Sequence, residues 1–261
     1  MIDIHSHIMP DIDDGARSLE ESLEMARIAA QDGIEYMVAT PHMFNGLSEN
    51  PEPSEIFHRV AALNDAVSGI GLKLLPGSEV HITPEIAEHA RNDRVMKINQ
   101  NNYMLVEFPR LTVPSEADDL FGKLLRQGVW PILVHPERNA LIQRQPHMIA
   151  KFVERGVLVQ ITAMSVTGEF GPAAKACADV LLSHDCVHFL ATDTHRTKSR
   201  PPVLSKGRDA AAAIIGRERA AALVDANPRA VINGEPLQVP LPISFASAAK
   251  SKRSFFARLF S

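Results

Sequence analysis

The sequence has little that would indicate a secreted, membrane-spanning or nucleic-acid-binding protein. Only two of its 261 residues are cysteine, Cys177 and Cys186, so the chain can form neither a disulfide framework nor a thiolate metal cage. No apolar run reaches the ~18 residues of a membrane span, and the N-terminus lacks the basic and apolar segments of a signal peptide. We therefore expect a cytoplasmic protein.

Surplus positive charge is also absent, since 27 Lys and Arg residues stand against 31 Asp and Glu residues. A duplex-binding protein needs extra cations to displace the counterions condensed on nucleic acid. We therefore predict no nucleic-acid partner. What the chain does have is a hydrophobic share of 45%, which is enough for a full core and favours a soluble enzyme or a binding module.

Short apolar segments alternate with longer amphipathic segments from the first residue to about residue 227. This alternation is typical of βα units, and strands that are apolar nearly throughout indicate a parallel sheet covered on both faces. Because no repeat or linker divides residues 1–240, we predict a single α/β domain, built as a closed or nearly closed barrel. The seven predicted strands are 2–5, 34–40, 72–80, 103–107, 130–135, 157–162 and 187–193.

The clearest predicted helix covers residues 18–32. Ser18 and Glu21 have the spacing of a capping box, in which the two side chains bond free backbone N–H groups at the start of the helix. Gly33 stands where a C-terminal cap belongs. Both helix ends are therefore predicted from the sequence.

Histidine and acidic residues fall where the predicted strands end. His5 and His7 lie at and just after the first strand, on the same side of an extended segment. In a parallel barrel all strand carboxyl ends share one rim, where such folds place their active sites. We therefore expect nine side chains to converge there, namely His5, His7, Asp14, His42, Glu79, Glu107, His135, Asp193 and His195.

Imidazoles and carboxylates together suit several divalent ions, such as manganese, iron or zinc, with no need for a sulfur ligand. Four carboxylates without counter-charge would repel one another and raise some of their pKa values. Up to three divalent ions would more than balance those negative charges. The pattern therefore predicts a metal site with more than one ion.

The motifs D-I-H-S-H, A-T-P-H, G-S-E-V-H, V-E-F, H-P-E-R and D-T-H, in this order, resemble those of the polymerase-and-histidinol-phosphatase (PHP) metalloenzymes. The opening D-I-H-S-H-I-M-P-D-I-D-D-G is most similar to the branch of manganese-dependent bacterial tyrosine phosphatases linked to capsule and exopolysaccharide synthesis. The resemblance extends to about residue 235. It implies the PHP fold, a distorted, TIM-like (β/α)7 barrel with three divalent ions, Mn²⁺ first and Fe or Zn as alternatives.

The resemblance also divides the ligands among the ions. It implies a first ion held by His5, His7, Glu79 and Asp193, a second by Glu79, Glu107 and His135, and a third by Asp14, His42 and His195. Two further residues match the phosphate-binding arginines of the branch, Arg138 and Arg200, and Arg196 is a rival to Arg200.

A metal-bridging hydroxide is the expected nucleophile, because metal coordination lowers the pKa of water to about 7. Arginine forks suit the phosphate oxygens. Tyrosine leaves as a phenoxide whose acid has a pKa near 10, so it needs less protonation than an alcohol, and His42 or His195 could assist. Cysteine chemistry is excluded, because a thiol-dependent phosphatase needs Arg six residues after its Cys, where this chain has Ser183 and Thr192.

The resemblance implies a protein-tyrosine phosphatase that acts on the phosphotyrosine tail of a membrane-bound bacterial kinase. Three alternatives remain open. A small-molecule phosphatase of the histidinol-phosphate type would use much the same ligands. A proofreading-type nuclease is disfavoured by the acidic charge balance, and a non-catalytic interaction module is disfavoured because no ligand position is lost.

Some rim residues have open roles. Phe44, Phe108 and Phe170 could flank a phosphotyrosine ring or belong to the core. His81, two residues after Glu79, could support a ligand or touch substrate, or do neither. His188 lies within the last predicted strand, where we expect a buried structural role.

Residues 241–261 differ from the barrel, because Lys250, Lys252, Arg253 and Arg258 are interleaved with aromatic and aliphatic side chains. Each cation near an anionic membrane contributes about 1 kcal/mol to binding. The tail could therefore make a peripheral membrane contact at the inner face of the membrane, or it could be a solvated, disordered segment.

Overall fold

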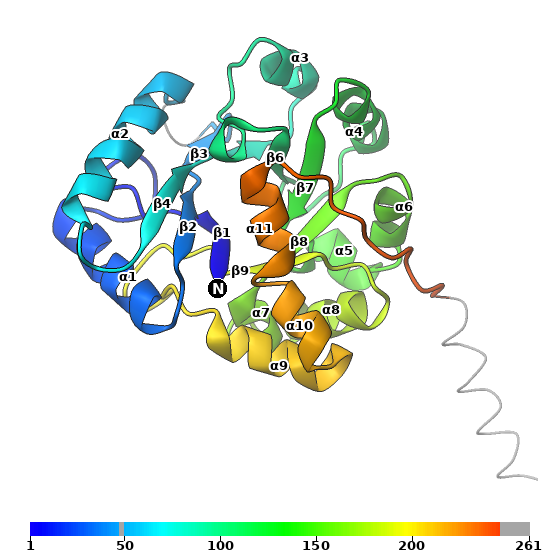
Figure 1. Ribbon diagram of the computed structural model, residues 1–261. Coiled ribbons are helices and arrows are strands. Elements are labelled where there is room, and N and C mark those ends of the chain that lie inside the picture. The colour runs from blue at the N-terminus through cyan, green and yellow to red at the C-terminus, as the bar shows by residue number, and fades with distance from the viewer. Residues whose placement is uncertain (47–49, 246–261) are drawn as a thin grey trace, which may run out of the picture.

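The computed structural model describes residues 1–46 and 50–245 of the chain. Parallel strands form the centre and the helices surround them (Figure 1). In chain order the elements are β1 (Ile2–Ser6), α1 (Leu19–Gln31), β2 (Tyr36–Ala39), β3 (His42–Met43), α2 (Pro53–Ala66), β4 (Lys73–Pro76), β5 (Glu79–His81), α3 (Ile86–Arg91), η1 (Ile98–Gln100), β6 (Tyr103–Glu107), α4 (Ala117–Arg126), β7 (Trp130–Val134), η2 (Pro136–Arg138), α5 (Ala140–Arg144), α6 (Met148–Glu154), β8 (Leu158–Thr162), α7 (Ala163–Thr167), α8 (Pro172–Ser183), β9 (Phe189–Ala191), α9 (Ser205–Ile215), α10 (Arg217–Ala222) and α11 (Ala226–Asn233).

Two parallel sheets make up a distorted barrel, in agreement with the predicted fold class. The smaller sheet has the order β1-β2-β4 and the larger has the order β3-β5-β6-β7-β8-β9. β2 and β3 follow each other within one segment, as do β4 and β5, so the sheets meet where these segments pass from one to the other. At the opposite seam, a parallel bridge between Ser6 and Thr194 joins β1 to the residues that follow β9.

All seven predicted strand segments contain strand, but the segment 72–80 is divided into β4 and β5, and β3 was not predicted. Gly77 lies at the break. A Cβ atom on this residue would stand 2.6 Å from Cγ1 of Val38, so only glycine allows the chain to pass so close to β2. The segment 72–80 passes from one sheet to the other at this close contact. The alternation of apolar residues along the segment does not predict the contact.

The interior of the barrel is apolar below the rim, and α11 closes its amino end (Figure 1). Asn99 donates a hydrogen bond of 2.9 Å to the carbonyl oxygen of Ile232, and the Tyr103 hydroxyl donates one of 2.6 Å to that of Glu235. The interior cluster consists of Ile2, Ile4, Val38, Leu75, Ile98, Tyr103, Leu105, Ile132, Val134, Leu158, Phe189, Ala191, Val231 and Ile232. A larger apolar cluster lies between the strands and the outer helices.

The predicted helix at 18–32 is confirmed as α1. Ser18 is its N-cap and accepts a hydrogen bond from the backbone N–H of Glu21. The Glu21 carboxylate accepts in return from the N–H of Arg17, one residue before the cap, at 2.9 Å. Gly33 follows the helix with φ +86°, a left-handed conformation that glycine adopts without a Cβ clash.

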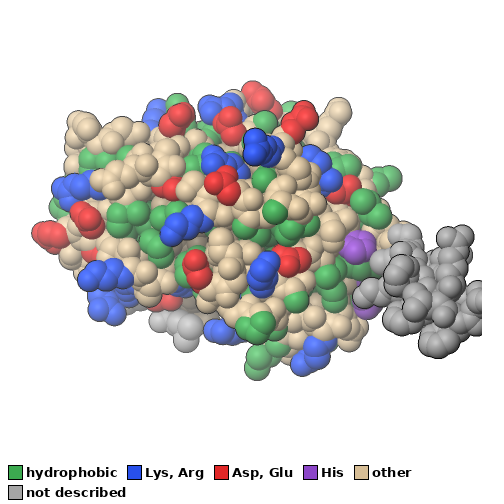
Figure 2. All heavy atoms as spheres, turned by 90° about the horizontal axis from the view of Figure 1, so that it is seen from below, with side chains coloured by type: hydrophobic (Ala, Val, Ile, Leu, Met, Phe, Trp, Pro, Cys, Tyr) green, Lys and Arg blue, Asp and Glu red, His purple; other side chains and the backbone are tan. Residues whose placement is uncertain are grey.

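Positive and negative side chains are intermingled on the face shown in Figure 2, which fits the near-neutral charge balance. Within the described residues, no helix is both long and apolar enough to span a membrane. The basic and aromatic tail at 250–260 lies outside the described residues, which end at Phe245. The division of the chain at residue 240 therefore stays a prediction.

Candidate metal centre

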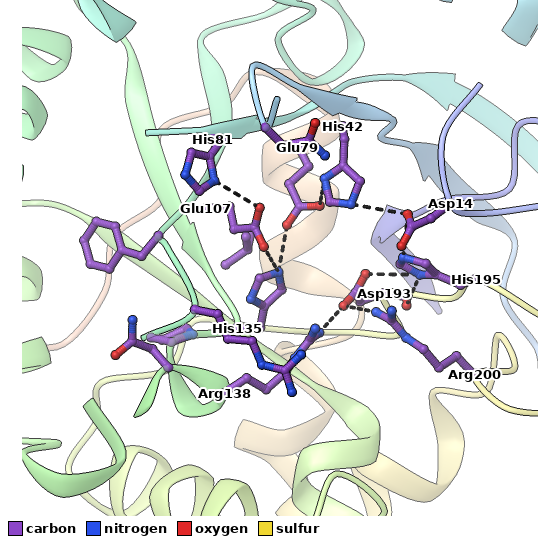
Figure 3. A pocket seen from close by; sticks show the side chains of 16 residues that line it. Asp14, His42, Glu79, His81, Glu107, His135, Arg138, Asp193, His195 and Arg200 are labelled. Carbon is purple, nitrogen blue, oxygen red and sulfur yellow. Dashed lines mark hydrogen bonds and ion pairs between the residues drawn. The ribbon is translucent and has the colours of Figure 1, made fainter. Parts of the chain in front are cut away.

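The carboxyl ends of the strands and the loops after them bring all nine predicted ligand side chains to one rim. All of them except His5 and His7 line a cavity of about 350 Å³ (Figure 3). Four overlapping groups occur, and within each group the potential ligand atoms lie within 4.8 Å of one another. The groups are His7, Asp14, His42 and His195; His5, His7 and Asp193; His5, Glu79 and His135; and His42, Glu79 and Glu107. The expected convergence is present in the structure.

Glu79 lies at the centre of this arrangement and is almost fully buried. Its Oε2 atom is 3.3 Å from Nε2 of both His5 and His7. The same atom is 3.0 Å from Nδ1 of His42, and Oε1 is 2.7 Å from Nε2 of His135. One carboxylate is therefore shared by four imidazoles, two from the end of β1, one from β3 and one from the end of β7.

Asp14 forms the second focus of the cluster. Its Oδ1 atom lies 3.2 Å from Nε2 of His195 and 3.4 Å from Nε2 of His42. The rings of His7 and His195 lie with their centroids 4.0 Å apart. Glu107 is at the other side, where Oε1 is 3.9 Å from Nε2 of His135.

Two buried atoms indicate that this donor set suits cations. Nδ1 of His42 and Oε2 of Glu79 are inaccessible to water and face each other at 3.0 Å as an ion pair, but neither has a well-directed hydrogen bond among the described residues. A buried polar atom without a well-directed hydrogen bond is costly, and a cation bound beside these two atoms would satisfy both. Nitrogen and oxygen ligands without sulfur match Mn²⁺, Fe²⁺ or Zn²⁺, so the residues present fit a divalent metal site.

The pKa values show the same demand for positive charge. Burial by itself raises the pKa of Glu79, but the charges of His5 and His42 hold it well below its usual range. Burial lowers the pKa of His42, whereas the Glu79 charge and the hydrogen bond to Asp14 raise it to about 10. Protons on these rings thus balance the carboxylates, and a metal ion that replaced them would release protons.

A local irregularity in β1 turns the first two histidines toward the cluster. Between Asp3 and Ser6, β1 has one residue more than β2 opposite it, so the alternation of side chains changes phase. Ile4 therefore packs in the barrel interior, while Nε2 of His5 and Nε2 of His7 still meet above it, 3.3 Å apart.

Asp14 reaches the rim because the loop after β1 folds back tightly on His7. A Cβ atom on Gly15 would stand 2.1 Å from the carbonyl oxygen of His7, so no other residue fits there without moving the loop. The backbone N–H of Gly15 donates to Oδ1 of Asp13 at 2.8 Å. This glycine thus places both aspartates of the D-D-G motif.

Two positioning residues were missed by the sequence analysis. Asp13 accepts a hydrogen bond of 2.8 Å from Nδ1 of His7 and another of 3.2 Å from the backbone of His42. Gln160, on β8, lies 3.0 Å from Nδ1 of His5 through Oε1. Asp13 and Gln160 each hold Nδ1 of a histidine ring, so that Nε2 of the same ring faces the cluster. The signal for Gln160 was a polar residue within an apolar strand.

Two predicted ligands have unusual backbone conformations. His135 has φ +36° and Asp193 has φ +50°, in the left-handed region that only a few per cent of residues other than glycine adopt. His135 directly follows β7, and Asp193 lies two residues after the end of β9. Strain of this kind persists only where the surrounding structure enforces it, and it gathers at functional sites.

The arginine side of the cavity faces the ligands. Arg138 and Arg200 both contact Oδ2 of Asp193, and both line the cavity (Figure 3). The other carboxylate oxygen of Asp193 lies 3.4 Å from His5 and 3.3 Å from His7. One carboxylate therefore links the two sides. Arg196 instead bonds its side chain to the carbonyl oxygen of His195, at 2.9 Å, and is absent from the described lining of the cavity.

Glu137 holds the turn that carries Arg138. This buried carboxylate accepts hydrogen bonds from the backbone of Thr162 at 3.0 Å and from the hydroxyl of Ser165 at 2.6 Å. The H-P-E-R segment is thereby tied to the end of β8 and to α7. This role was not assigned from the sequence.

The three aromatic rings considered for substrate contact lie in different places. Phe108 lines the cavity. Phe44 stacks on His89, with ring centroids 4.2 Å apart, and Phe170 packs against the two cavity arginines. Neither of these two belongs to the described cavity lining, so the expectation that they flank a substrate ring has no geometric support.

The remaining candidates are also placed by the structure. His81 lines the cavity, with Nδ1 3.4 Å from Oε2 of Glu107, a position that suits support of that ligand. His188 is buried, as predicted, and its Nδ1 accepts a hydrogen bond from Val159. Burial raises the pKa of the Cys177 and Cys186 thiols to about 12, so neither is a ready nucleophile.

The comparisons with known proteins agree with the geometry. The tyrosine-protein phosphatase YwqE of Bacillus subtilis is 40% identical over 202 residues, which cover 77% of this chain and 79% of YwqE. The tyrosine-protein phosphatase CpsB of Streptococcus pneumoniae is 30% identical over 239 residues, which cover 89% of this chain and 98% of CpsB.

Solved structures give the same relationship. A structure from a study of YwqE and CpsB, described there as unique metal-dependent tyrosine phosphatases, matches with a TM-score of 0.89 and 34% identity over 93% of this chain and 98% of that chain. A TatD-family hydrolase from Entamoeba histolytica, at 10% identity and a TM-score of 0.54, shares the fold alone. A family model described as capsular polysaccharide synthesis, CpsB/CapC, matches residues 1–233, and the chain therefore belongs to the CpsB/CapC family.

Proposed function

We propose that this protein is a metal-dependent tyrosine phosphatase, a phosphoric monoester hydrolase of capsular or exopolysaccharide synthesis. The observation that carries this proposal is the bridging carboxylate of Asp193. One oxygen faces the histidines of the candidate metal centre and the other contacts both Arg138 and Arg200. A phosphate group that met the arginines would thus lie directly beside the metal ligands. The names of the relatives support the same activity.

Three divalent ions, with Mn²⁺ favoured over Fe or Zn, are the proposed cofactors. The proposed ligand sets, which follow the resemblance, are His5, His7, Glu79 and Asp193 for the first ion, Glu79, Glu107 and His135 for the second, and Asp14, His42 and His195 for the third. The third set lies within one of the four groups of the structure, whereas the members of the other two are spread over more than one group. Divalent ions supply Lewis acidity, which lowers the pKa of water and neutralises phosphate charge.

The chain's own residues would bind and orient the ester. The planar guanidinium groups of Arg138 and Arg200 suit bidentate contacts to non-bridging phosphate oxygens. Phe108 offers an apolar ring to the tyrosine side chain within the same cavity. Water in the cavity would supply the proton to the departing phenoxide, whose acid has a pKa near 10 and needs little assistance, and His42 or His195 would assist by orienting that water.

The proposed substrate is the phosphotyrosine tail of a membrane-bound bacterial kinase that controls polysaccharide export. The family's role in capsular polysaccharide synthesis supports this assignment. Such a substrate would place the protein in the cytoplasm, at the inner face of the membrane. Peripheral contact through residues 241–261 is part of this proposal, and cosedimentation of the full chain and a chain ending at Pro240 with anionic vesicles tests it; equal binding would contradict it.

The test of the proposed function compares a phosphotyrosine peptide with histidinol phosphate as substrates of the manganese-loaded protein. We expect hydrolysis of the peptide with a kcat/KM at least about 10²-fold higher, and a loss of roughly 10²-fold or more on Arg138→Met, because a charged contact to the developing phosphate charge is removed.

Arg196→Met is the matched control, since this arginine follows His195 directly but bonds the backbone away from the cavity. It should keep nearly full activity. A preference for histidinol phosphate would favour the small-molecule alternative, and equal losses in the two arginine variants would contradict the assigned phosphate contact.

A further inference from the structure

We propose that Phe170 is a positioning residue that holds the two phosphate-facing guanidinium groups side by side. This inference rests on the proposed function of Arg138 and Arg200. The Cζ atom of Arg138 lies 4.7 Å from the centroid of the Phe170 ring, and the Cζ atom of Arg200 lies 5.6 Å from it. One ring therefore serves both cations, within the distance at which cation–π attraction acts.

Two guanidinium groups at one site repel each other, so their arrangement needs a compensating contact. Asp193 provides one, because both arginines bond its Oδ2 atom. The side chains of Arg138 and Arg200 are only 23% and 21% exposed. Because they are mostly buried, water screens the repulsion between their charges only in part. A negative ring face next to both groups adds a second compensation that does not depend on Asp193.

The loop that carries Phe170 is well fixed. It follows α7 and runs between Gly168 and Gly171, which have φ +97° and +92°. The backbone N–H groups of Gly168 and Glu169 both bond the carbonyl oxygen of Met164, at 3.1 and 2.9 Å. The ring is thus presented by a tight turn, which lets it define the position of two long side chains.

The ring contact is compatible with substrate binding. An aromatic face attracts the flat face of a guanidinium, and the N–H groups at the guanidinium edge stay free for phosphate oxygens. When phosphate takes N–H groups that Asp193 had bonded, the contact with Phe170 can persist. Since Phe170 is absent from the described lining of the cavity, it acts through the arginines and not on the ester.

The test measures phosphate affinity, because inorganic phosphate has no aromatic group that Phe170 could touch. In the manganese-loaded protein we expect Phe170→Leu, which keeps an apolar side chain but removes the ring, to weaken binding of inorganic phosphate about 3- to 10-fold by calorimetry. KM for p-nitrophenyl phosphate should rise by a similar factor with a smaller change in kcat. Phe170→Tyr should retain wild-type phosphate binding.

Phe108→Leu is the matched control, because this ring lines the cavity and could touch an aryl group. It should change binding of aryl esters and leave the affinity for inorganic phosphate unchanged. In the background of Arg200→Met the effect of Phe170→Leu on phosphate should be clearly smaller, since one of the two cations is then gone.

Unchanged phosphate affinity in Phe170→Leu, or a loss in Phe170→Tyr as large as in the leucine variant, would overturn the proposal. A lower melting temperature with unchanged phosphate affinity would also reject it, because the residue would then be only structural. Calorimetry does not require turnover, so these outcomes are distinguishable from a failure of the proposed function, which would show as a wild-type protein that binds phosphate but hydrolyses no phosphotyrosine.

Discussion

The two sides of the cavity are built in opposite ways. The ligand side, defined by the nine predicted metal ligands, consists largely of buried imidazoles and carboxylates at the ends of strands. On the arginine side, Arg138 and Arg200 come from the turn η2 and from a loop, and each is about one fifth exposed. Strand ends give the ligand side its precision, whereas the arginine side depends on secondary contacts such as Asp193 and Phe170.

The strongest way to break the ligand side is to remove the charge of Glu79. In Glu79→Gln the volume is kept, but four imidazoles lose the carboxylate they share. We expect a loss of bound metal and a fall in kcat of about 10³-fold or more, because bound cations supply the Lewis acidity of the reaction. Elemental analysis and phosphotyrosine hydrolysis measure the two effects.

Glu88→Gln, at an exposed position of α3, is the control and should change neither quantity. A Glu79→Gln protein with its full metal content would show that this carboxylate is not a ligand.

A smaller loss of activity is expected on substitution of Asp13, which contacts the predicted ligand His7 but does not belong to the described lining of the cavity. In Asp13→Asn the charge that orients Nδ1 of His7 is lost. Residues of this kind change metal affinity or activity by about 10- to 100-fold. Excess Mn²⁺ should restore part of the activity, as measured by titration of the chelated protein.

The matched control is Asp11→Asn in the same loop, where φ is +52° and asparagine is tolerated. If both variants lose the same activity, the effect belongs to the loop and not to His7.

Away from the cavity, His188 shows how a buried histidine behaves without carboxylate neighbours. Burial lowers its pKa to about 4 from 6.5. Below pH 6.5 the unfolded chain binds a proton at this ring that the folded protein does not bind. The free energy of unfolding therefore decreases as the pH falls from 6.5 toward 4, by up to about 3 kcal/mol from this group.

Denaturant unfolding of wild type and His188→Gln at several pH values, both with chelator, isolates that contribution. The difference between the two proteins should vary with pH in this window. His58→Gln, at an exposed position of α2, controls for the exchange of histidine for glutamine itself. A constant difference would mean that His188 titrates alike in both states.

The smallest effect is expected from thiol modification. Cys177 and Cys186 are 3% and 0% exposed, and burial raises the pKa of both thiols to about 12. Iodoacetamide should therefore leave both cysteines and the phosphatase activity intact, as mass spectrometry and kinetics would show. The same reagent in denaturant should label both. Loss of activity in step with a single alkylation would contradict a purely metal-based reaction.

The position of the ligands could be predicted from the sequence because it follows from topology. Parallel strands end at one rim, so residues such as Glu79 and Asp193 must meet whatever the details of packing. The break between β4 and β5 at Gly77 does not take Glu79 away from the rim, since β5 begins at Glu79 itself.

Features that depend on one close contact could not be predicted. The extra residue in β1 and the return of the loop over Gly15 decide which aspartate of D-D-G supports His7 and which faces the cavity. In the same way, Arg200 lines the cavity whereas Arg196 bonds the carbonyl oxygen of His195, and the spacing of the two arginines along the chain does not predict this difference. A sequence pattern gives residue types and their spacing along the chain, but the roles of these aspartates and arginines depend on distances in the folded structure.

The seam between β1 and the residues after β9 also has a consequence for biosynthesis. The first strand to leave the ribosome acquires its final neighbours only when Thr194 and α11 have been made. A nascent chain that ends at residue 190 already carries every proposed ligand except Asp193 and His195, yet it lacks the helix that closes the barrel. The candidate metal centre therefore has its full set of predicted ligands and its closing helix only when nearly the whole barrel has been synthesised.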